Sequence, residues 1–235
     1  MLLEVKELDA GYGYLQILRK VCLTVDKGEY VCIVGPNGAG KSTTMKAISG
    51  LIKPMGGKII FNGENITGLP AYEITQKGIA FVSEEMNLFV NMTVQENLLM
   101  GAYIIRDKKI QRDRLDFIFD LFPRLAERKK QLAGTMSGGE RKMLAIGRGM
   151  MSNPTLMLVD EPSFGLAPQL TENVFQSLDV LTKSGVTIML VEQNVTKTLS
   201  VTNRGYVLEN GKIGLAGKSS DLANDGYVRK VFLGV

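Results

Sequence analysis

The chain has 235 residues, of which 45% are hydrophobic and 22% charged, and it carries a formal net charge of +4. This length allows one large domain or one domain with an inserted lobe, and this composition is ordinary for a soluble globular protein. The net charge is too small for the concentrated basic field of a nucleic-acid-binding surface. The N-terminus shows no secretory pattern and no apolar run approaches the ~20 residues that span a bilayer, so we expect a cytoplasmic protein.

The sequence contains two cysteines, Cys22 and Cys32, and no histidine. Both cysteines lie in or beside apolar, strand-like runs, and their spacing matches no metal or redox motif. We therefore predict two buried free thiols in a reducing compartment. Without histidine, any proton transfer at a catalytic site must use other side chains.

Hydrophobic periodicity predicts strands and helices that alternate along the chain. The predicted strands cover residues 3–8, 21–25, 30–34, 58–61, 79–82, 155–159, 187–191, 204–209 and 213–216. The predicted helices cover residues 41–49, 113–122, 141–150 and 168–183, and a further helix begins at a capping box of Thr93 and Glu96. Two of the strands are followed by Asn-Gly, which suits a tight hairpin turn.

This order of elements favours a parallel α/β core with a small antiparallel sheet. Residues 85–151 have mostly helical periodicity, and strands resume after them. We therefore interpret this region as an inserted helical lobe rather than as a separate domain.

A glycine-rich stretch joins the predicted strand 30–34 to the helix that follows it. Its residues are Gly35, Pro36, Asn37, Gly38, Ala39, Gly40, Lys41 and Ser42, which fit the pattern G-x-x-x-x-G-K-[ST]. In such a loop, backbone N–H groups surround phosphate oxygens, Lys41 supplies a positive charge to the β- and γ-phosphates, and Ser42 ligates Mg²⁺. We predict a phosphate-binding loop that extends to Thr43, rather than a flexible glycine turn.

Two adjacent acids, Asp160 and Glu161, end the buried strand that begins near Leu156. Consecutive residues at the end of a strand point in different directions, so each can have its own role. Together with a phosphate-binding loop, Asp160 can hold Mg²⁺ through water, and Glu161 can orient or deprotonate the attacking water. The alternative is a solvated turn that carries two acids.

A serine and two glycines, Ser137, Gly138 and Gly139, stand at the start of the helical pattern that covers residues 141–150. Taken alone, Ser137 is most simply the N-cap of that helix. Such a helix start is also a second anion-binding site. A chain with one nucleotide loop has little internal use for a second phosphate site, which suggests that this site serves the nucleotide of another subunit.

These motifs together resemble those of the ABC ATPases. The stretch Met136-Ser-Gly-Gly-Glu140 resembles the LSGGQ signature of that family. The Gly35 loop and the Asp160-Glu161 pair stand where the family has its Walker A and Walker B motifs. The likeness runs through essentially the whole chain, and it implies that the protein binds ATP with Mg²⁺ and hydrolyses it.

The resemblance also implies a fold and a domain organisation. It predicts a single ABC ATPase domain over residues 1–235, with a P-loop NTPase (RecA-like) α/β core. Residues 1–84 and 152–235 would form this nucleotide-binding core with an antiparallel β subdomain. Residues 85–151 would form an α-helical subdomain that carries the signature motif.

In the family, two nucleotide-binding domains pack head to tail, and each signature motif closes on the γ-phosphate held by the other domain. The resemblance therefore assigns the signature residues to the nucleotide of a second ABC ATPase subunit, paralogous or identical; they are Ser137, Gly138, Gly139 and Glu140. It also places the D-loop at Ser163–Ala167, where Ala167 replaces the usual aspartate and leaves a polar contact across the dimer in doubt.

Three further site residues follow from the resemblance. Tyr12 stands where the family has the aromatic residue that stacks on adenine, although Tyr14 is a near competitor and a core tyrosine is the alternative. Glu84 stands at the Q-loop glutamine, where a carboxylate can still ligate Mg²⁺ or can be a merely exposed acid. Gln193 replaces the histidine that contacts the γ-phosphate. Because an amide cannot shuttle a proton, base chemistry falls to Glu161 or to the phosphate itself.

Glu84, the Val191–Asn194 stretch and the Asp160–Pro168 run resemble the ATP-binding subunits of branched-chain amino acid importers. The implied partners are integral membrane permease subunits and, indirectly, a substrate-binding protein, but no nucleic acid. The subunit would be cytoplasmic and peripheral on the inner face of the cell membrane. The chain departs from the subgroup at Ser83 and at residues 85–87, so the substrate is the open question.

Other functions remain as alternatives. Within transport, the rival is an ATPase for the uptake of urea, amides or other amino acids. A soluble, non-transport ABC ATPase that acts on ribosomes or DNA would usually have tandem nucleotide domains, a long coiled coil or a basic extension, and this sequence shows none of them. A P-loop kinase or GTPase is disfavoured by the signature motif and by the lack of an N-K-x-D motif.

Overall fold

The computed structural model describes residues 1–233, and the last two residues of the predicted nucleotide-binding core, 234–235, lie outside the described residues. The strands are β1 (Leu3–Tyr12), β2 (Leu15–Val25), β3 (Tyr30–Val34), β4 (Gly56–Phe61), β5 (Glu64–Asn65), β6 (Ile79–Val82), β7 (Leu156–Asp160), β8 (Thr187–Val191), β9 (Arg204–Glu209) and β10 (Lys212–Lys218). The helices are α1 (Lys41–Ile48), α2 (Ala71–Gln76), α3 (Val94–Gly101), α4 (Lys108–Leu121), α5 (Pro123–Glu127), α6 (Gly138–Met150), α7 (Pro168–Lys183), α8 (Val195–Val201), α9 (Ser219–Asn224) and α10 (Gly226–Val228). Two further short elements are a 3-10 helix, η1 (Ala133–Thr135), and a π-helix, η2 (Arg229–Leu233).

The strands form two sheets. The larger has six strands in the order β10-β9-β3-β8-β7-β6, and the smaller has four in the order β2-β1-β4-β5. Strands β9, β3, β8, β7 and β6 run parallel, and β10 pairs antiparallel with β9 at the edge. The smaller sheet is antiparallel. The predicted parallel α/β core with a small antiparallel sheet is therefore confirmed.

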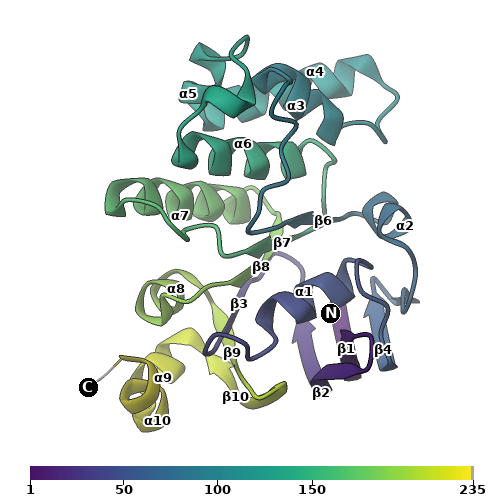
Figure 1. Cartoon of the computed structure of the whole chain (residues 1–235), viewed down its shortest axis with the longest axis vertical. Coiled ribbons are helices and arrows are strands. Elements are labelled where there is room, and N and C mark those ends of the chain that lie inside the picture. Colours follow the sequence, from purple (N-terminus) through teal and green to yellow (C-terminus); the bar gives the residue numbers. More distant parts are fainter. Residues whose placement is uncertain (234–235) are drawn as a thin grey trace.

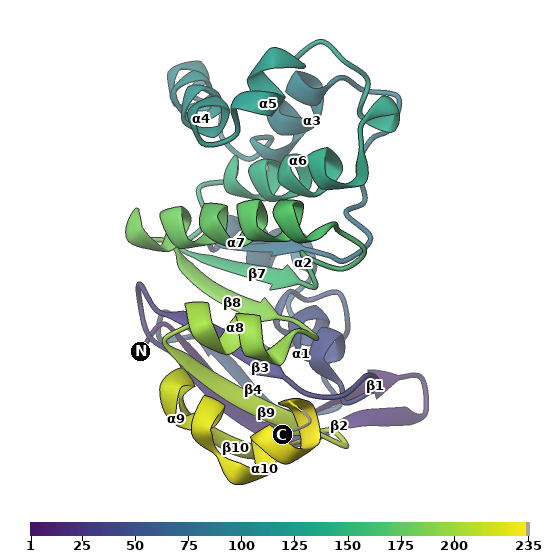
Figure 2. The ribbon, with the colours of Figure 1, turned by 90° about the vertical axis from the view of Figure 1, so that its left-hand side faces the viewer.

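Both faces of the larger sheet are covered (Figure 1 and Figure 2). Successive side chains of a strand point to opposite faces. In β3, Cys32 and Val34 pack into one apolar core with residues of α7 and α8, whereas Val31 and Ile33 pack into another with residues of α1 and the smaller sheet. Because β3 is buried on both faces, its residues form a continuous apolar run in the sequence.

Helices α3, α4, α5 and α6 lie together at one end of the molecule, beyond α7, and we call them the helical layer (Figure 1). The last of them, α6, is the one nearest to α7 and the sheet. Within residues 1–233, every helix is too short or too polar to traverse a lipid bilayer.

Local signals in the sequence set several element ends as predicted. Thr93 and Glu96 form the capping box that opens α3. Both Asn-Gly pairs adopt the left-handed conformations of tight hairpin turns, for example Asn62 with a φ of +50° and Gly63 with a φ of +80°. Helix α4 ends at Leu121, directly before the segment that Pro123 opens.

Other element ends differ from the prediction. β1 extends to Tyr12 and β2 begins at Leu15, because these residues pair across a tight turn at Gly13. Helix α4 begins at Lys108 rather than at 113, because the Asp107 carboxylate caps its first turn by accepting two backbone hydrogen bonds. In both cases a polar or glycine residue outside the periodic apolar stretch sets the boundary.

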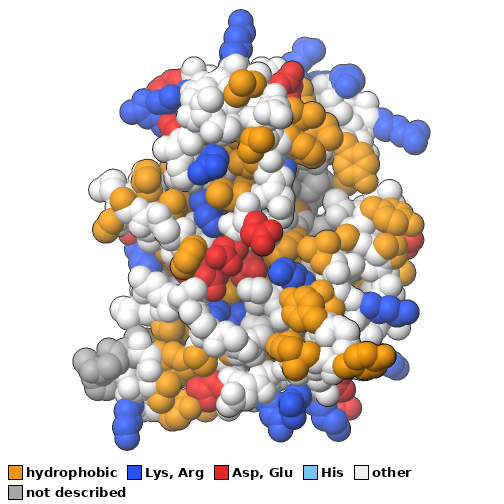
Figure 3. Space-filling model, viewed as in Figure 1, with side chains coloured by type: hydrophobic (Ala, Val, Ile, Leu, Met, Phe, Trp, Pro, Cys, Tyr) orange, Lys and Arg blue, Asp and Glu red, His pale blue; other side chains and the backbone are white. Residues whose placement is uncertain are grey.

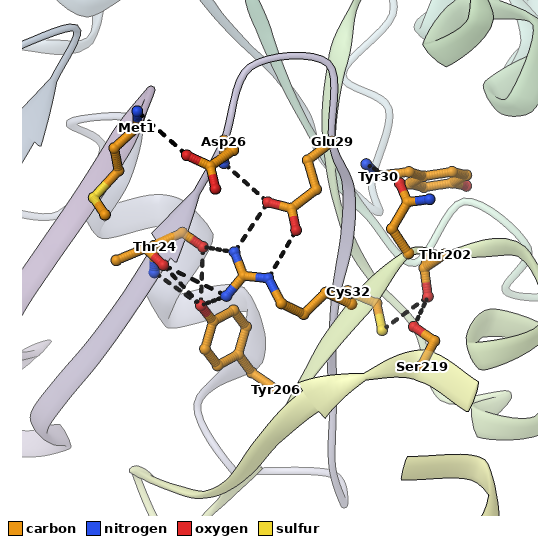
Figure 4. Close-up of polar contacts among 11 residues, drawn as sticks. Met1, Thr24, Asp26, Glu29, Tyr30, Cys32, Thr202, Tyr206 and Ser219 are labelled. Atoms are coloured by element: carbon orange, nitrogen blue, oxygen red, sulfur yellow. Dashed lines mark hydrogen bonds and ion pairs between the residues drawn. The ribbon is translucent and has the colours of Figure 1, made fainter. Parts of the chain in front are cut away.

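The prediction that both cysteines are buried is wrong for Cys22. Cys32 lies in the buried strand β3, where burial raises the pKa of its thiol to about 11. Thr202 donates a hydrogen bond to its sulfur (Figure 4). Cys22 is exposed because β2 alternates, and Val21 and Leu23 on either side of Cys22 take the positions that face the core.

Arg204, the first residue of β9 in the larger sheet, forms a hydrogen bond with Thr24 of β2 in the smaller sheet. Its guanidinium donates hydrogen bonds of 2.7 and 2.9 Å to the Glu29 carboxylate, and one of 2.7 Å to the carbonyl oxygen of Thr24 in β2. It also donates to the hydroxyl of Tyr206, which in turn donates to the Thr24 carbonyl. The hydrogen bonds to Glu29 raise the pKa of Arg204. This network holds the smaller sheet against the larger one.

We predict that Arg204→Met lowers the free energy of unfolding by about 2–3 kcal/mol, because the Glu29 carboxylate and the Thr24 carbonyl lose a charged donor. Chemical denaturation followed by circular dichroism measures the loss. The matched control is Lys183→Met, which removes an exposed pair with Asp179 and should cost about 0.5 kcal/mol or less. Equal effects of the two substitutions would contradict the anchoring role of Arg204.

Candidate functional site

Four loops meet at the carboxyl edge of the parallel strands. The loop after β3 begins with Gly35, and the loop after β6 contains Glu84. Asp160 ends β7, and Gln193 lies just after β8. Because β8 lies between β3 and β7, its loop stands between the loops of its two neighbours. In open parallel sheets this edge is where ligands bind.

The loop between β3 and α1 has the features of a phosphate-binding turn. Gly40 has a φ of +106°, and a Cβ there would lie 2.6 Å from a methyl group of Leu18, so the position needs glycine. Helix α1 begins at the next residue, Lys41, and the first amide groups of a helix have no partner within it. The buried Lys41 ammonium donates to the carbonyl oxygens of Gly35, at 2.9 Å, and Pro36, at 3.2 Å. This loop can surround a phosphate with N–H groups and one positive charge.

Asp160 is a buried carboxylate beside Ser42, whose hydroxyl donates a hydrogen bond of 3.0 Å to its Oδ1 atom. Asp160 is 2% exposed, and this burial raises its pKa to about 6, although the Ser42 hydrogen bond lowers it. A hydroxyl and a carboxylate are hard oxygen ligands of the kind that Mg²⁺ prefers, and a desolvated carboxylate gains from a bound cation. The residues therefore fit a magnesium ion.

The described residues contain no cluster of three or more acidic, cysteine or histidine side chains that could enclose a metal ion by themselves. Magnesium commonly keeps several waters and binds through one or two carboxylates together with substrate phosphates. The Ser42–Asp160 pair therefore suits a metal that arrives with a nucleotide.

Glu161 is held at its backbone and at its carboxylate. Its φ is +45°, a left-handed conformation that costs a non-glycine residue about 1–2 kcal/mol. Its N–H donates to the carbonyl oxygen of Val191 at 2.9 Å, and its carboxylate accepts a hydrogen bond from the side-chain amide of Gln193. The other carboxylate oxygen lies 4.0 Å from the Lys41 ammonium. Burial raises the pKa of Glu161, while Gln193 and Lys41 lower it.

A cavity of about 790 Å³ opens beside this cluster, and Ser42, Glu84 and Asp160 are among the residues that line it. Tyr12, at the end of β1, lines it as well. Tyr14 is fully exposed at the hairpin turn and is not among the lining residues. Figure 3 shows acidic side chains gathered near the middle of one face, with hydrophobic side chains to their right. Of the two candidate tyrosines, Tyr12 is the one that shares a cavity with the nucleotide loop.

Ser137 caps α6 through a capping box with Glu140. The hydroxyl and the N–H of Ser137 donate to the Glu140 carboxylate at 2.8 and 2.9 Å, and the Glu140 N–H points back to the hydroxyl at 3.4 Å. Glu140 also forms an ion pair of 2.9 Å with Arg128. The simple N-cap interpretation of Ser137 is therefore correct in this chain, and it leaves the Glu140 carboxylate fully engaged.

The two glycines of the motif have different surroundings. A Cβ on Gly139 would lie 2.7 Å from the side chain of Leu170, so glycine lets α6 approach α7 closely. A Cβ on Gly138 would meet nothing within 4 Å, and this end of the helix is exposed. Among the described residues that line the cavity beside Ser42, neither glycine is present. The role predicted for this helix start towards another subunit's nucleotide stays a prediction.

Two buried charged residues near the site were not predicted from the sequence. Lys142 lies on the buried face of α6 and is 5% exposed. A signal existed, since its spacing from Ile146 puts it on an apolar helical face. Glu192 is 2% exposed, and its carboxylate accepts a hydrogen bond of 2.8 Å from the N–H of Ser163. Nothing in the polar segment that follows β8 distinguishes Glu192 from a solvated acid.

A parallel sheet, a strand–glycine loop–helix unit and a carboxylate at the end of another strand, separated from the first by one strand, define a P-loop nucleotide-binding protein. The sequence profile of the family described as ABC transporter matches residues 18–164, which is more than half of the chain. The chain therefore belongs to the ABC transporter family, and it is a nucleotide-binding, ATP-hydrolysing subunit of that family.

Known proteins match the chain over nearly its whole length. The high-affinity branched-chain amino acid transport ATP-binding protein BraG of Pseudomonas aeruginosa is 44% identical over 233 residues, which cover 99% of this chain and 100% of that protein. The lipopolysaccharide export system ATP-binding protein LptB of Haemophilus influenzae is 34% identical over 235 residues, which cover 99% of this chain and 97% of that protein. The crystal structure of an ABC transporter ATP-binding cassette in its ADP conformation superposes with a TM-score of 0.84 at 28% identity, covering 100% of this chain and 99% of the other.

We predict that Asp160→Asn stabilises the protein at pH 7.5 in EDTA, because the amide removes a buried charge and can still accept the Ser42 hydrogen bond. The pKa of Asp160 is about 6 in the folded protein, above the ordinary 3.8. Ionisation of this buried carboxyl group therefore lowers the free energy of unfolding of the native protein as the pH rises from 3.8 to 6, by up to about 3 kcal/mol. Denaturant titrations at pH 7.5 and pH 5 measure the gain, which should fall to roughly half at pH 5. The exposed control Asp113→Asn should change stability little at either pH. A gain that does not depend on pH would contradict the prediction.

Proposed function

We propose that the chain is the ATP-hydrolysing subunit of an importer for branched-chain amino acids. The ATPase activity is supported by one observation: Lys41, Asp160 and Glu161 lie together at one edge of the sheet. The substrate class is supported by the 44% identity to BraG over that protein's full length, compared with 34% identity to LptB.

ATP is proposed to bind along residues 35–43, with its adenine ring stacked on Tyr12. The N–H groups at the start of α1 and the Lys41 ammonium would surround the phosphates. Tyr12 is supported by its place in the cavity that Ser42 also lines. Its ring is about half exposed, which leaves a face available for stacking.

Ser42, Asp160 and Glu84 are the proposed magnesium ligands. Ser42 and Asp160 are in direct contact at 3.0 Å, and Glu84 lines the same cavity. A bound magnesium ion would neutralise charge on the β- and γ-phosphates. The burial that raises the pKa of Asp160 makes this carboxylate a group that gains from such a cation.

Glu161 is proposed to orient the attacking water and to accept its proton. Burial raises the pKa of Glu161, which strengthens it as a base near neutral pH. Gln193 holds one carboxylate oxygen, and its second amide hydrogen can donate to the γ-phosphate. Lys41 can stabilise the negative charge that develops on the transferred phosphate. This set of residues performs the chemistry without histidine.

The proposed working unit contains a second ABC ATPase subunit, paralogous or identical. The exposed helix start at Ser137 and Gly138 supports this proposal, because it offers an anion site that does not face the chain's own cavity. The proposed nucleotide-binding core covers 1–84 and 152–235, and the proposed helical subdomain covers 85–151. ATP between two such subunits would close them, and hydrolysis would release them.

The proposed membrane partners are permease subunits that dock at exposed side chains of the cavity lining. Four hydrophobic side chains that line the cavity are exposed, and exposed apolar surface can mark interaction sites. They are Leu51, Phe89, Met100 and Tyr103. With permeases bound here, the subunit would lie on the inner face of the cell membrane, and a substrate-binding protein would act indirectly on the other side.

We predict that Glu161→Gln lowers the rate of ATP hydrolysis by about 100-fold or more, because the amide cannot accept a proton. ATP affinity should be retained, so that the variant accumulates as an ATP-loaded dimer. Phosphate release, equilibrium ATP binding and light scattering measure the three properties. Gln193→Ala keeps the carboxylate and should lower turnover less, without abolishing ATP binding. Full ATPase activity of Glu161→Gln would exclude it as the base.

We predict that cells lacking this subunit lose uptake of radiolabelled leucine, isoleucine and valine, and that the wild-type chain restores it while Glu161→Gln does not. The tagged Glu161→Gln variant, trapped with ATP, should also co-purify integral permease subunits from native membranes. Loss of urea or amide uptake instead, or of lipopolysaccharide export as the likeness to LptB suggests, would replace the proposed substrate. Capture of ribosomes or DNA in place of permeases would overturn the transport proposal.

A further inference from the structure

Lys142 places a buried ammonium group behind the candidate site. Its Nζ atom donates hydrogen bonds to two backbone carbonyl oxygens, that of Glu84 at 2.9 Å and that of Glu161 at 3.0 Å. Burial lowers the pKa of Lys142, and the surrounding acids oppose this change. A single side chain therefore contacts both the loop after β6 and the loop after β7.

These two hydrogen bonds join three parts of the chain that are distant in sequence. Lys142 belongs to α6, the member of the helical layer that lies nearest to the sheet (Figure 1). Glu84 follows β6 and Glu161 follows β7, which are neighbouring strands. Any displacement of α6 relative to the sheet therefore acts directly on the backbone of both loops.

Glu161 is the more constrained of the two contacted residues. Its backbone is left-handed, with a φ of +45°, and such a conformation persists only where its surroundings hold it. Val191 holds its N–H and Gln193 holds its carboxylate, and both come from the β8 region. Lys142, which belongs to α6 rather than to the sheet, holds the Glu161 carbonyl group. The direction of the Glu161 carboxylate thus depends on a residue of the helical layer.

Packing alone does not account for a lysine at this position. The residues that share the buried face of α6 are mostly apolar, including Met143 and Ile146. Burying an ammonium between two neutral carbonyl groups costs more free energy than burying a methionine of similar length. The presence of a lysine at position 142 is therefore explained by its two hydrogen bonds and not by the space that its side chain fills.

We propose that Lys142 is a positioning residue for ATP hydrolysis. It fixes the carbonyl groups of Glu84 and Glu161, so that the two loops move with α6 as one unit and the Glu161 carboxylate keeps its direction. This inference rests on the proposed function, in which Glu161 is the base. Among the described residues, the bonds of the Lys142 ammonium go to these two carbonyls and not to the phosphate-binding loop. Its loss should therefore change turnover and leave ATP binding in place.

The test substitutes Lys142 in the full chain and separates turnover from binding. Lys142→Met should lower kcat by about 10- to 100-fold, the effect of a misdirected catalytic group, and change KM for ATP by less than about threefold. The free energy of unfolding should change little, since the removal of a buried charge offsets the loss of two hydrogen bonds. Lys142→Gln retains a donor that can reach one carbonyl group and should give an intermediate kcat. The control Lys109→Met alters an exposed lysine of α4 and should change neither constant.

A double variant shows whether Lys142 acts through Glu161. In a Glu161→Gln background, adding Lys142→Met should lower the residual turnover little further, because the two residues act on one step. Additive losses would overturn the proposal, and so would a loss of ATP binding that parallels the loss of turnover. Failure of both Lys142 variants to fold would also overturn it, since Lys142 would then be merely structural. If Glu161→Gln alone keeps full activity, the proposed base is wrong; if it is inactive while Lys142→Met keeps the wild-type kcat, only this inference fails.

Discussion

Strand β8 is hydrogen-bonded to β3 on one side and to β7 on the other, and all three strands run in the same direction. Val191 of β8 lies opposite both Ile33 and Asp160, so the three strands reach the edge of the sheet at the same level. Because of this register, the loop after β8 brings Gln193 to Glu161 between the other two loops. If β8 paired elsewhere, the phosphate-binding loop and the acids would be parts of two separate surfaces.

The same edge of the sheet concentrates buried charged side chains. Two lysines, Lys41 and Lys142, and three acids, Asp160, Glu161 and Glu192, are each at most 6% exposed. Burial lowers the pKa of the two lysines and raises the pKa of Asp160 and Glu161, so every one of these four groups is shifted towards its neutral form. Such a site is prepared for a highly charged ligand, because phosphates and a divalent cation offset charges that the protein alone leaves poorly solvated.

Local sequence signals predicted the fold and part of the site well. The capping box at Thr93, the N-cap at Ser137, the Asn-Gly turns and the glycine loop before Lys41 each depend on a few adjacent residues, so the sequence alone identifies them. Predictions that needed a neighbouring element were weaker. Cys22 was misplaced because the apolar character of β2 does not tell which face of the strand is covered.

The sequence by itself determined the chemistry that is available: a phosphate-binding loop, two strand-end acids, a glutamine just after a strand and an N-capped helix. These properties follow from residue type and short-range spacing, which act within one or two turns of the backbone. The tertiary structure alone decided which groups meet. It set the contact of Gln193 with Glu161, the choice of Tyr12 over Tyr14 at the cavity, and the two carbonyl groups that Lys142 holds. Those contacts depend on strand order and helix packing, because the residues that make them are far apart in the chain.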